Sequence, residues 1–125
     1  MRRPTPIADQ YAWYHAALKN PRAPVHEGEP QCGLFKARDG RASPWAAVQI
    51  CLSQPLDEHG ALIAPERHYA LINGDRPIWD AARVDEIWLW AARRPITAEE
   101  YAALLQQSRE GFALDTGSSV LRAEA

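Results

Sequence analysis

The chain has 125 residues, of which 46% are hydrophobic and 24% are charged. This size and composition are those of one globular domain and not of a disordered chain. The formal net charge of −2 disfavours nucleic acid as a non-specific partner. The alternative is a local basic patch formed by cations that come together in the fold. Its candidate members are Arg2, Arg3, Arg22, Lys36, Arg38, Arg41, Arg93 and Arg94.

The two cysteines, Cys32 and Cys51, occur in segments of strand character and not in paired ligand spacings. We therefore expect neither a disulfide framework nor a structural metal site. No apolar run is long enough to cross a bilayer, and prolines 4 and 6 interrupt the region where a signal peptide would be apolar. The expected compartment is the cytoplasm.

The first predicted element is a helix with Thr5 as N-cap and Pro6 at its first position, ending before Asn20-Pro21. One apolar stripe of this helix consists of Ile7, Tyr11, Tyr14 and Leu18. Trp13 lies off the stripe, so it is either part of a second packing face or an exposed anchor. The following residues, 21–31, have the composition of a loop.

Three or four antiparallel strands are predicted next, over residues 33–38, 45–52, 67–72 and 76–79. The strand over 45–52 is the clearest, because its side chains alternate at period two and one of its faces is entirely apolar. The Asn73-Gly74 dipeptide is typical of a type I′ hairpin turn. Pro77 restricts the last segment to a sheet edge.

Helical periodicity returns over residues 81–93, where one stripe consists of Val84, Ile87, Trp88 and Ala91. Leu89 and Trp90 fall outside this stripe. A helix that is apolar on more than one side is covered either by other helices of its own chain or by a second copy of the chain. The second reading predicts a homodimer through Leu89 and Trp90.

A last helix is predicted from Thr97, which forms a capping box with Glu100. Its expected core residues are Tyr101, Leu104, Leu105 and Phe112. The predicted class is therefore α+β, with an N-terminal helix, a three- to four-stranded antiparallel meander and two C-terminal helices, the helices lying on one face of the sheet. We expect one domain over residues 1–112 and a flexible tail over 113–125.

The sequence contains no phosphate loop, dinucleotide fingerprint, nucleophile elbow or zincin motif. We predict no catalytic residues, no metal and no cofactor. A weaker alternative is a metal site at the loop residues His26, Glu27, Glu29 and Cys32. Another is a small hydrolase that uses loop carboxylates and His26. Residues 57–59 (Asp-Glu-His) also form an acid/base group, although turn geometry explains their presence.

Five tryptophans are more than a core of this size usually holds, and tryptophan is enriched in binding hot spots. A nucleotide base could stack on an indole while an arginine meets the phosphate. The predicted ligand- or partner-binding residues are Trp13, Trp45, Trp79, Trp90, Arg38 and Arg76.

Four short segments carry a resemblance: residues 29–33 (Glu-Pro-Gln-Cys-Gly), Pro44-Trp45, 57–62 (Asp-Glu-His-Gly-Ala-Leu) and 95–101. Over roughly residues 10–105 the chain resembles small uncharacterised proteins carried by phages and prophages of proteobacteria. The resemblance implies a bacterial host cytoplasm and an accessory binding protein, such as an anti-defence factor that blocks a host protein or sequesters a small nucleotide signal. The alternative is a small nucleic-acid-associated module acting near phage replication or packaging.

Overall fold

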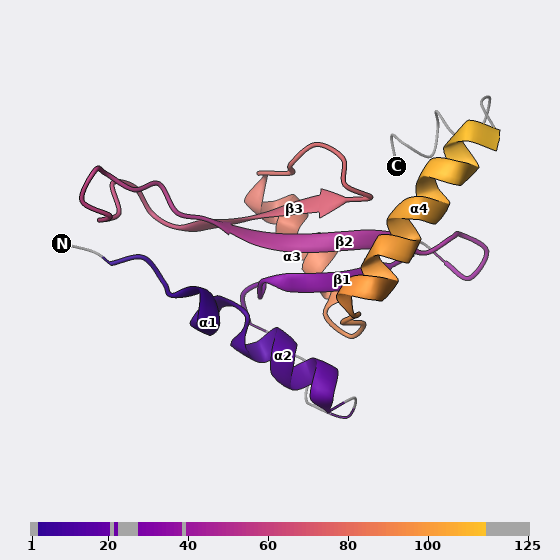
Figure 1. The fold of residues 1–125 in the computed structure, drawn as a ribbon, viewed down its shortest axis with the longest axis horizontal. Coiled ribbons are helices and arrows are strands. Elements are labelled where there is room, and N and C mark those ends of the chain that lie inside the picture. Colours follow the sequence, from indigo (N-terminus) through magenta and orange to yellow (C-terminus); the bar gives the residue numbers. More distant parts are fainter. Residues whose placement is uncertain (1–2, 21, 23–27, 39, 115–125) are drawn as a thin grey trace.

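The computed structural model describes residues 3–20, 22, 28–38 and 40–114, with side chains up to residue 109 in the last range. The elements are α1 (Ile7–Gln10), α2 (Ala12–Lys19), β1 (Gly33–Ala37), β2 (Ala46–Ser53), β3 (Arg67–Ile72), α3 (Ala81–Ala91) and α4 (Ala98–Leu114). Helices and an antiparallel sheet confirm the α+β class (Figure 1). None of the described helices is long and apolar enough to cross a membrane.

The sheet has three antiparallel strands in the order β1-β2-β3. A single bridge extends each edge, Phe35 with Pro95 beside β1 and Ala70 with Ile78 beside β3. The predicted fourth strand is thus reduced to one residue, whose amide and carbonyl both bond to Ala70, at 2.8 and 3.1 Å. Pro77 has no N–H to donate, so the pairing is interrupted next to the bridge.

The turn at Asn73-Gly74 confirms the predicted type I′ geometry. Both residues have positive φ, 54° and 70°, and the Asp75 amide donates to the Ile72 carbonyl at 3.0 Å. Asn73 also pairs with Ala47: its amide donates to the Ala47 carbonyl at 2.7 Å, and its Oδ1 accepts from the Ala47 amide at 2.9 Å. The asparagine side chain thereby continues the β2–β3 ladder into the turn.

The N-terminal helix differs from its prediction. It begins at Ile7 and is broken at Tyr11, whose φ and ψ are −104° and 6°, so that two short helices replace one. Thr5 does not cap it; instead, the amide and hydroxyl of Thr5 donate to the Glu66 carboxylate at 3.0 and 2.9 Å. A tertiary contact thus holds Thr5, and Pro6, which stays extended, takes the position before the first helical residue.

Helices cover both faces of the sheet, so the prediction of helices on one face was wrong. In Figure 1, α4 crosses the front of the sheet and α3 lies behind it. The larger core, under α2 and α3, includes Tyr14, Phe35, Val48, Ile50, Val84 and Trp88. The smaller core, under α4, consists of Ala47, Ile96 and Leu104. Because β2 is apolar on both faces at its first half, each face needs a cover.

Helix α3 buries the predicted stripe of Val84, Ile87, Trp88 and Ala91. It begins after Asp80, whose Oδ1 accepts from the Ala82 amide at 3.1 Å, and it ends two residues before the predicted position. Leu89 is 71% exposed and Trp90 is 45% exposed. Neither side chain belongs to the two cores that the described residues form.

Helix α4 begins after Thr97 as predicted, and Thr97 Oγ1 accepts from the Glu100 amide at 3.2 Å. The Glu100 carboxylate accepts from Lys36, so the structure gives only the Thr97 half of the predicted capping box. Leu104 is buried, and Tyr101 and Leu105 pack beside it. The helix continues to Leu114, past the expected domain limit at residue 112. The side chain of Phe112 and all of residues 115–125 lie outside the described part, so the flexible tail stays a prediction.

Candidate functional site

Three cations surround one half-buried indole at the end of the sheet where β1 connects to β2. The Arg38 Cζ lies 4.2 Å, the Lys36 Nζ 4.9 Å and the Arg94 Cζ 5.2 Å from the ring centroid of Trp45. We call these four residues the Trp45 cluster. It unites two of the predicted binding residues, Trp45 and Arg38, with Lys36 and Arg94, which the sequence indicated only as candidate members of a basic patch.

Strand pairing brings the cluster together. Lys36 is opposite Ala47 in the β1–β2 register, on the face that α4 covers, and Trp45 directly precedes β2. The Lys36 amide donates to the Arg94 carbonyl at 3.1 Å, which lays the segment after α3 along β1. The alternation of residues 33–38 could have placed Lys36, whereas no local signal indicates that Arg94 returns to this edge.

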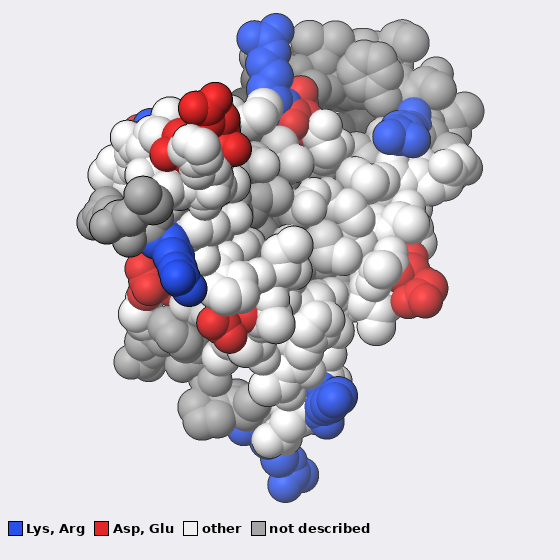
Figure 2. Space-filling view, turned by 60° about the vertical axis from the view of Figure 1, so that its left-hand side comes forward, with Lys and Arg blue, Asp and Glu red and all other residues white. Residues whose placement is uncertain are grey.

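The charges of the Trp45 cluster are only partly neutralised. Lys36 pairs with Glu100 at 2.9 Å, and both side chains are partly exposed. No carboxylate among the described residues pairs with Arg38 or Arg94. Among the described residues, three cations with one carboxylate give this cluster a local positive charge, although the chain is acidic overall. Figure 2 shows one face of the molecule, where charges of both signs are scattered over a mostly uncharged surface.

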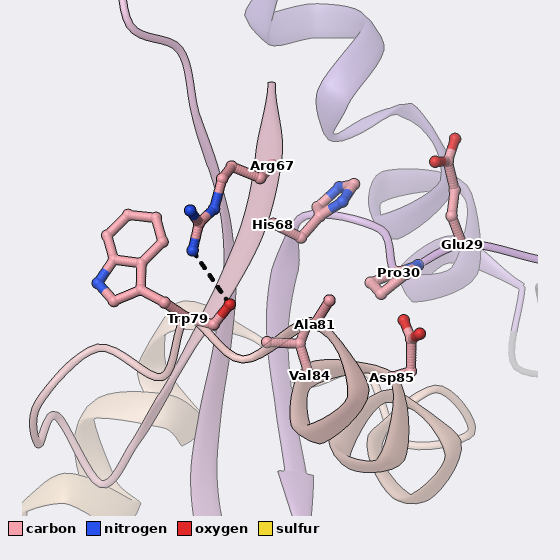
Figure 3. A pocket seen from close by; sticks show the side chains of 8 residues that line it. All are labelled: Glu29, Pro30, Arg67, His68, Trp79, Ala81, Val84 and Asp85. Atoms are coloured by element: carbon pink, nitrogen blue, oxygen red, sulfur yellow. Dashed lines mark hydrogen bonds between the residues drawn. The ribbon is translucent and has the colours of Figure 1, made fainter. Parts of the chain in front are cut away.

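A cavity of about 490 Å³ lies at the opposite end of the sheet, between the start of β3, the start of α3 and the residues just before β1 (Figure 3). Its polar lining consists of Glu29, Arg67, His68 and Asp85. Its less polar lining consists of Pro30, Trp79, Ala81 and Val84. His68 pairs with Leu52, next to the last pair of the β2–β3 ladder, so the length of β2 separates this cavity from Trp45.

The side chains that line the cavity differ in their protonation and in their contacts. The pKa of His68 is lowered by burial, against the opposing effect of the carboxylates of Glu29, Glu66 and Asp85, so the ring is neutral at neutral pH. Arg67 donates to the Trp79 carbonyl at 3.2 Å, and its Cζ lies 4.9 Å from the Trp79 ring centroid. The Trp79 ring also meets Tyr69, with 4.4 Å between centroids.

The other predicted binding residues are dispersed. Trp13 is partly buried and packs against the core, with its ring centroid 6.2 Å from Phe35 and 5.4 Å from Trp88. Trp90 lies on the outer side of α3, and Arg76 is exposed in the β3–α3 connection. Among the described residues, no cation–π contact links Arg76 to a tryptophan. Arg67 and His68 were missed because strand residues at a sheet edge carry no motif.

Neither cysteine is in surroundings that would activate it as a nucleophile. Burial raises the pKa of the Cys32 thiol to about 12 and also raises that of Cys51, so both thiols stay protonated. Asp57 caps a turn, since its Oδ1 accepts from the amides of His59 and Ala61 at 2.8 and 3.0 Å. Among the described residues no three potential ligands gather for a metal ion. His26 and Glu27 lie outside the described residues.

Comparison of the chain with models of protein families, with curated proteins and with solved structures finds no match.

Proposed function

We propose that this chain is a non-enzymatic binding protein that captures a small phosphate-bearing ligand of the nucleotide class. The observation that carries the proposal is the Trp45 cluster, in which three cations converge on one indole and only Lys36 has a carboxylate partner among the described residues. The protonated state of both cysteines supports binding over nucleophilic catalysis.

The cluster suits phosphate more than a base. Like charges held near one another repel, and a dianionic phosphate would relieve that repulsion while accepting charge-assisted hydrogen bonds. The indole holds the guanidinium groups of Arg38 and Arg94 in place before the ligand arrives. Because these groups already lie against the ring, a base would have to displace one of them in order to stack on Trp45.

The biological role that we propose follows the resemblance to phage and prophage proteins. In that setting the ligand would be a nucleotide signal of the bacterial host, and holding it would keep it from its receptor. A function of this kind needs affinity and no reaction, which agrees with the lack of catalytic sequence motifs.

Isothermal titration calorimetry with ATP as the probe tests the proposal. Arg38→Ala and Arg94→Ala should each weaken ATP binding by about tenfold or more, the loss expected for one charge-assisted contact. Arg76→Ala is the matched control, because Arg76 is exposed and outside the cluster. Equal affinities for the two cluster variants and the control, with the melting temperature preserved in all three, would refute the proposal.

An oligonucleotide titration separates this proposal from the nucleic-acid alternative. We expect little binding of single-stranded or duplex DNA at physiological salt, since the net charge is −2. Tight DNA binding that weakens steeply with salt, and whose salt slope is flattened by Arg38→Ala, would instead favour the module associated with phage replication or packaging.

The exposure of Leu89 and Trp90 favours a second candidate function, binding of another protein chain through α3. The simplest partner is a second copy, in which the two helices meet across a two-fold axis. Sedimentation equilibrium at micromolar concentration should then show a dimer that Leu89→Ala or Trp90→Ala dissociates without unfolding. A monomeric wild type would exclude self-association and leave a host protein as the partner to seek.

A further inference from the structure

The cavity beside β3 carries opposite charges on opposite walls. In Figure 3, Arg67 lies on one side, and Glu29 and Asp85 lie on the other. His68 projects between them. Ala81 and Val84, at the start of α3, lie between these two sides, and Pro30 lies on the side of Glu29 and Asp85. The volume of the cavity, about 490 Å³, is within the range of small-molecule sites, roughly 300–1,000 Å³.

The two walls differ in what they can still bind. Arg67 uses one N–H on the Trp79 carbonyl, and a guanidinium has five N–H donors, so it can also hold a carboxylate. No ion pair among the described residues engages Glu29 or Asp85. Both carboxylates are exposed and available to an ammonium group. His68, neutral at neutral pH, can donate or accept one hydrogen bond.

We propose that this cavity binds a small zwitterionic molecule of the amino-acid class, with its carboxylate on Arg67 and its ammonium between Glu29 and Asp85. Its apolar body would lie over Pro30 and Val84. A simple anion would meet two carboxylates, and a simple cation would meet the guanidinium. Only a ligand with both charges finds a partner at each end.

This site is independent of the proposed nucleotide capture. The two sites use no common residue, and the length of β2 separates them. Arg38→Ala, which should weaken ATP binding, should therefore leave zwitterion binding unchanged.

Calorimetry at pH 7.5 with three matched probes tests the inference. 6-Aminohexanoate carries both charges, hexylamine only the ammonium and hexanoate only the carboxylate. We expect 6-aminohexanoate to bind at least about tenfold more tightly than either singly charged probe. Equal affinities for the three probes, or no saturation by 6-aminohexanoate up to about 10 mM, would overturn the inference.

Variants assign the two ends of the ligand. Arg67→Gln should reduce 6-aminohexanoate binding to the level of hexylamine, and Asp85→Asn should reduce it to the level of hexanoate. The matched controls are Arg76→Gln and Asp75→Asn, which alter the same residue types outside the cavity. Cavity variants that melt like the wild type and bind like the controls would also overturn the inference.

The ring of His68 supplies a readout other than affinity. The carboxylates of Glu29 and Asp85 favour its protonation, and a ligand ammonium beside them would offset that effect. The pKa of His68, followed by NMR, should therefore fall on binding of 6-aminohexanoate or hexylamine and should not fall with hexanoate. An unchanged pKa of His68 at saturation with 6-aminohexanoate would contradict the placement of the ammonium.

Discussion

Gly33 is the position where one added methyl group should do the most damage. A Cβ there would lie 2.5 Å from Cδ1 and 2.7 Å from Cγ of Tyr14, whose ring is buried and whose hydroxyl donates to the Ile96 carbonyl. Carbon atoms in contact are normally 3.5–4.0 Å apart, so the ring would have to move by about 1 Å. Gly33→Ala therefore forces Tyr14 out of its place between α2 and β1.

The expected cost combines three effects. Overpacking a core costs about 1–3 kcal/mol, and weakening the buried Tyr14 hydrogen bond costs about 1 kcal/mol more. Replacing glycine by alanine restores about 0.5–1 kcal/mol through the unfolded chain, because Gly33 is not among the glycines with positive φ. The free energy of unfolding should fall by about 2 kcal/mol, which lowers Tm by about 8 °C.

Urea denaturation followed by circular dichroism measures the effect, and a double-mutant cycle identifies its cause. In a Tyr14→Ala background the obstructing ring is gone, so Gly33→Ala should become neutral or slightly stabilising. The coupling free energy between the two sites should reach about 2 kcal/mol. A Gly33→Ala protein within about 0.5 kcal/mol of the wild type, or a cost that persists without the Tyr14 ring, would refute the reasoning.

Further predictions concern the turn and two titrating groups. Asn73→Ala should cost about 2 kcal/mol, from the φ of 54° and the lost bond to Ala47, whereas Asn73→Gly should cost about 1 kcal/mol; urea denaturation compares them. Burial lowers the pKa of His68 in the folded protein. The unfolded chain therefore binds more protons than the folded protein as the pH falls from 7 to 5, and the free energy of unfolding declines. Thermal melts at several pH values should show a smaller decline for His68→Gln. Hydrogen bonds from Gln54 and Thr5 lower the pKa of Glu66, so Glu66 contributes fully to stability above its ordinary pKa and loses that contribution on further acidification. Glu66→Gln should therefore lose less stability in acid than the wild type does. An equal loss of stability would contradict this contact.

Most individual elements of this fold could be predicted because their causes are local. The alternation of residues 45–52 follows from the pleat of a strand, which sends neighbouring side chains to opposite faces. Asn73-Gly74 accepts positive φ at both positions, so the hairpin turn follows from two residues. Thr97 supplies a side-chain acceptor to the first turn of α4, whatever that helix later packs against.

Binding residues were predicted less completely, because a residue type does not say which residues will be its neighbours. Trp45 and Arg38 were both named, but their contact depends on the β1–β2 connection. Trp13 is of a residue type common in binding sites, yet its partly buried ring packs beside Phe35 and Trp88 against the core. A large aromatic residue looks the same in a sequence whether the fold buries it or exposes it.

Chain order and apolar spacing by themselves determined the α+β class, the antiparallel sheet and the buried stripe of α3. Tertiary structure decided what those elements meet. Glu66, 61 residues away, accepts hydrogen bonds from the amide and hydroxyl of Thr5, and the first helix begins at Ile7. Helix α4 packs on the second face of the sheet because β2 places the apolar Ala47 there. The hydrogen bond between Lys36 and Arg94 brings Arg94 back to β1 and completes the Trp45 cluster. Local geometry is set by the few residues that share one turn or strand, whereas a site needs side chains that only packing brings within contact distance.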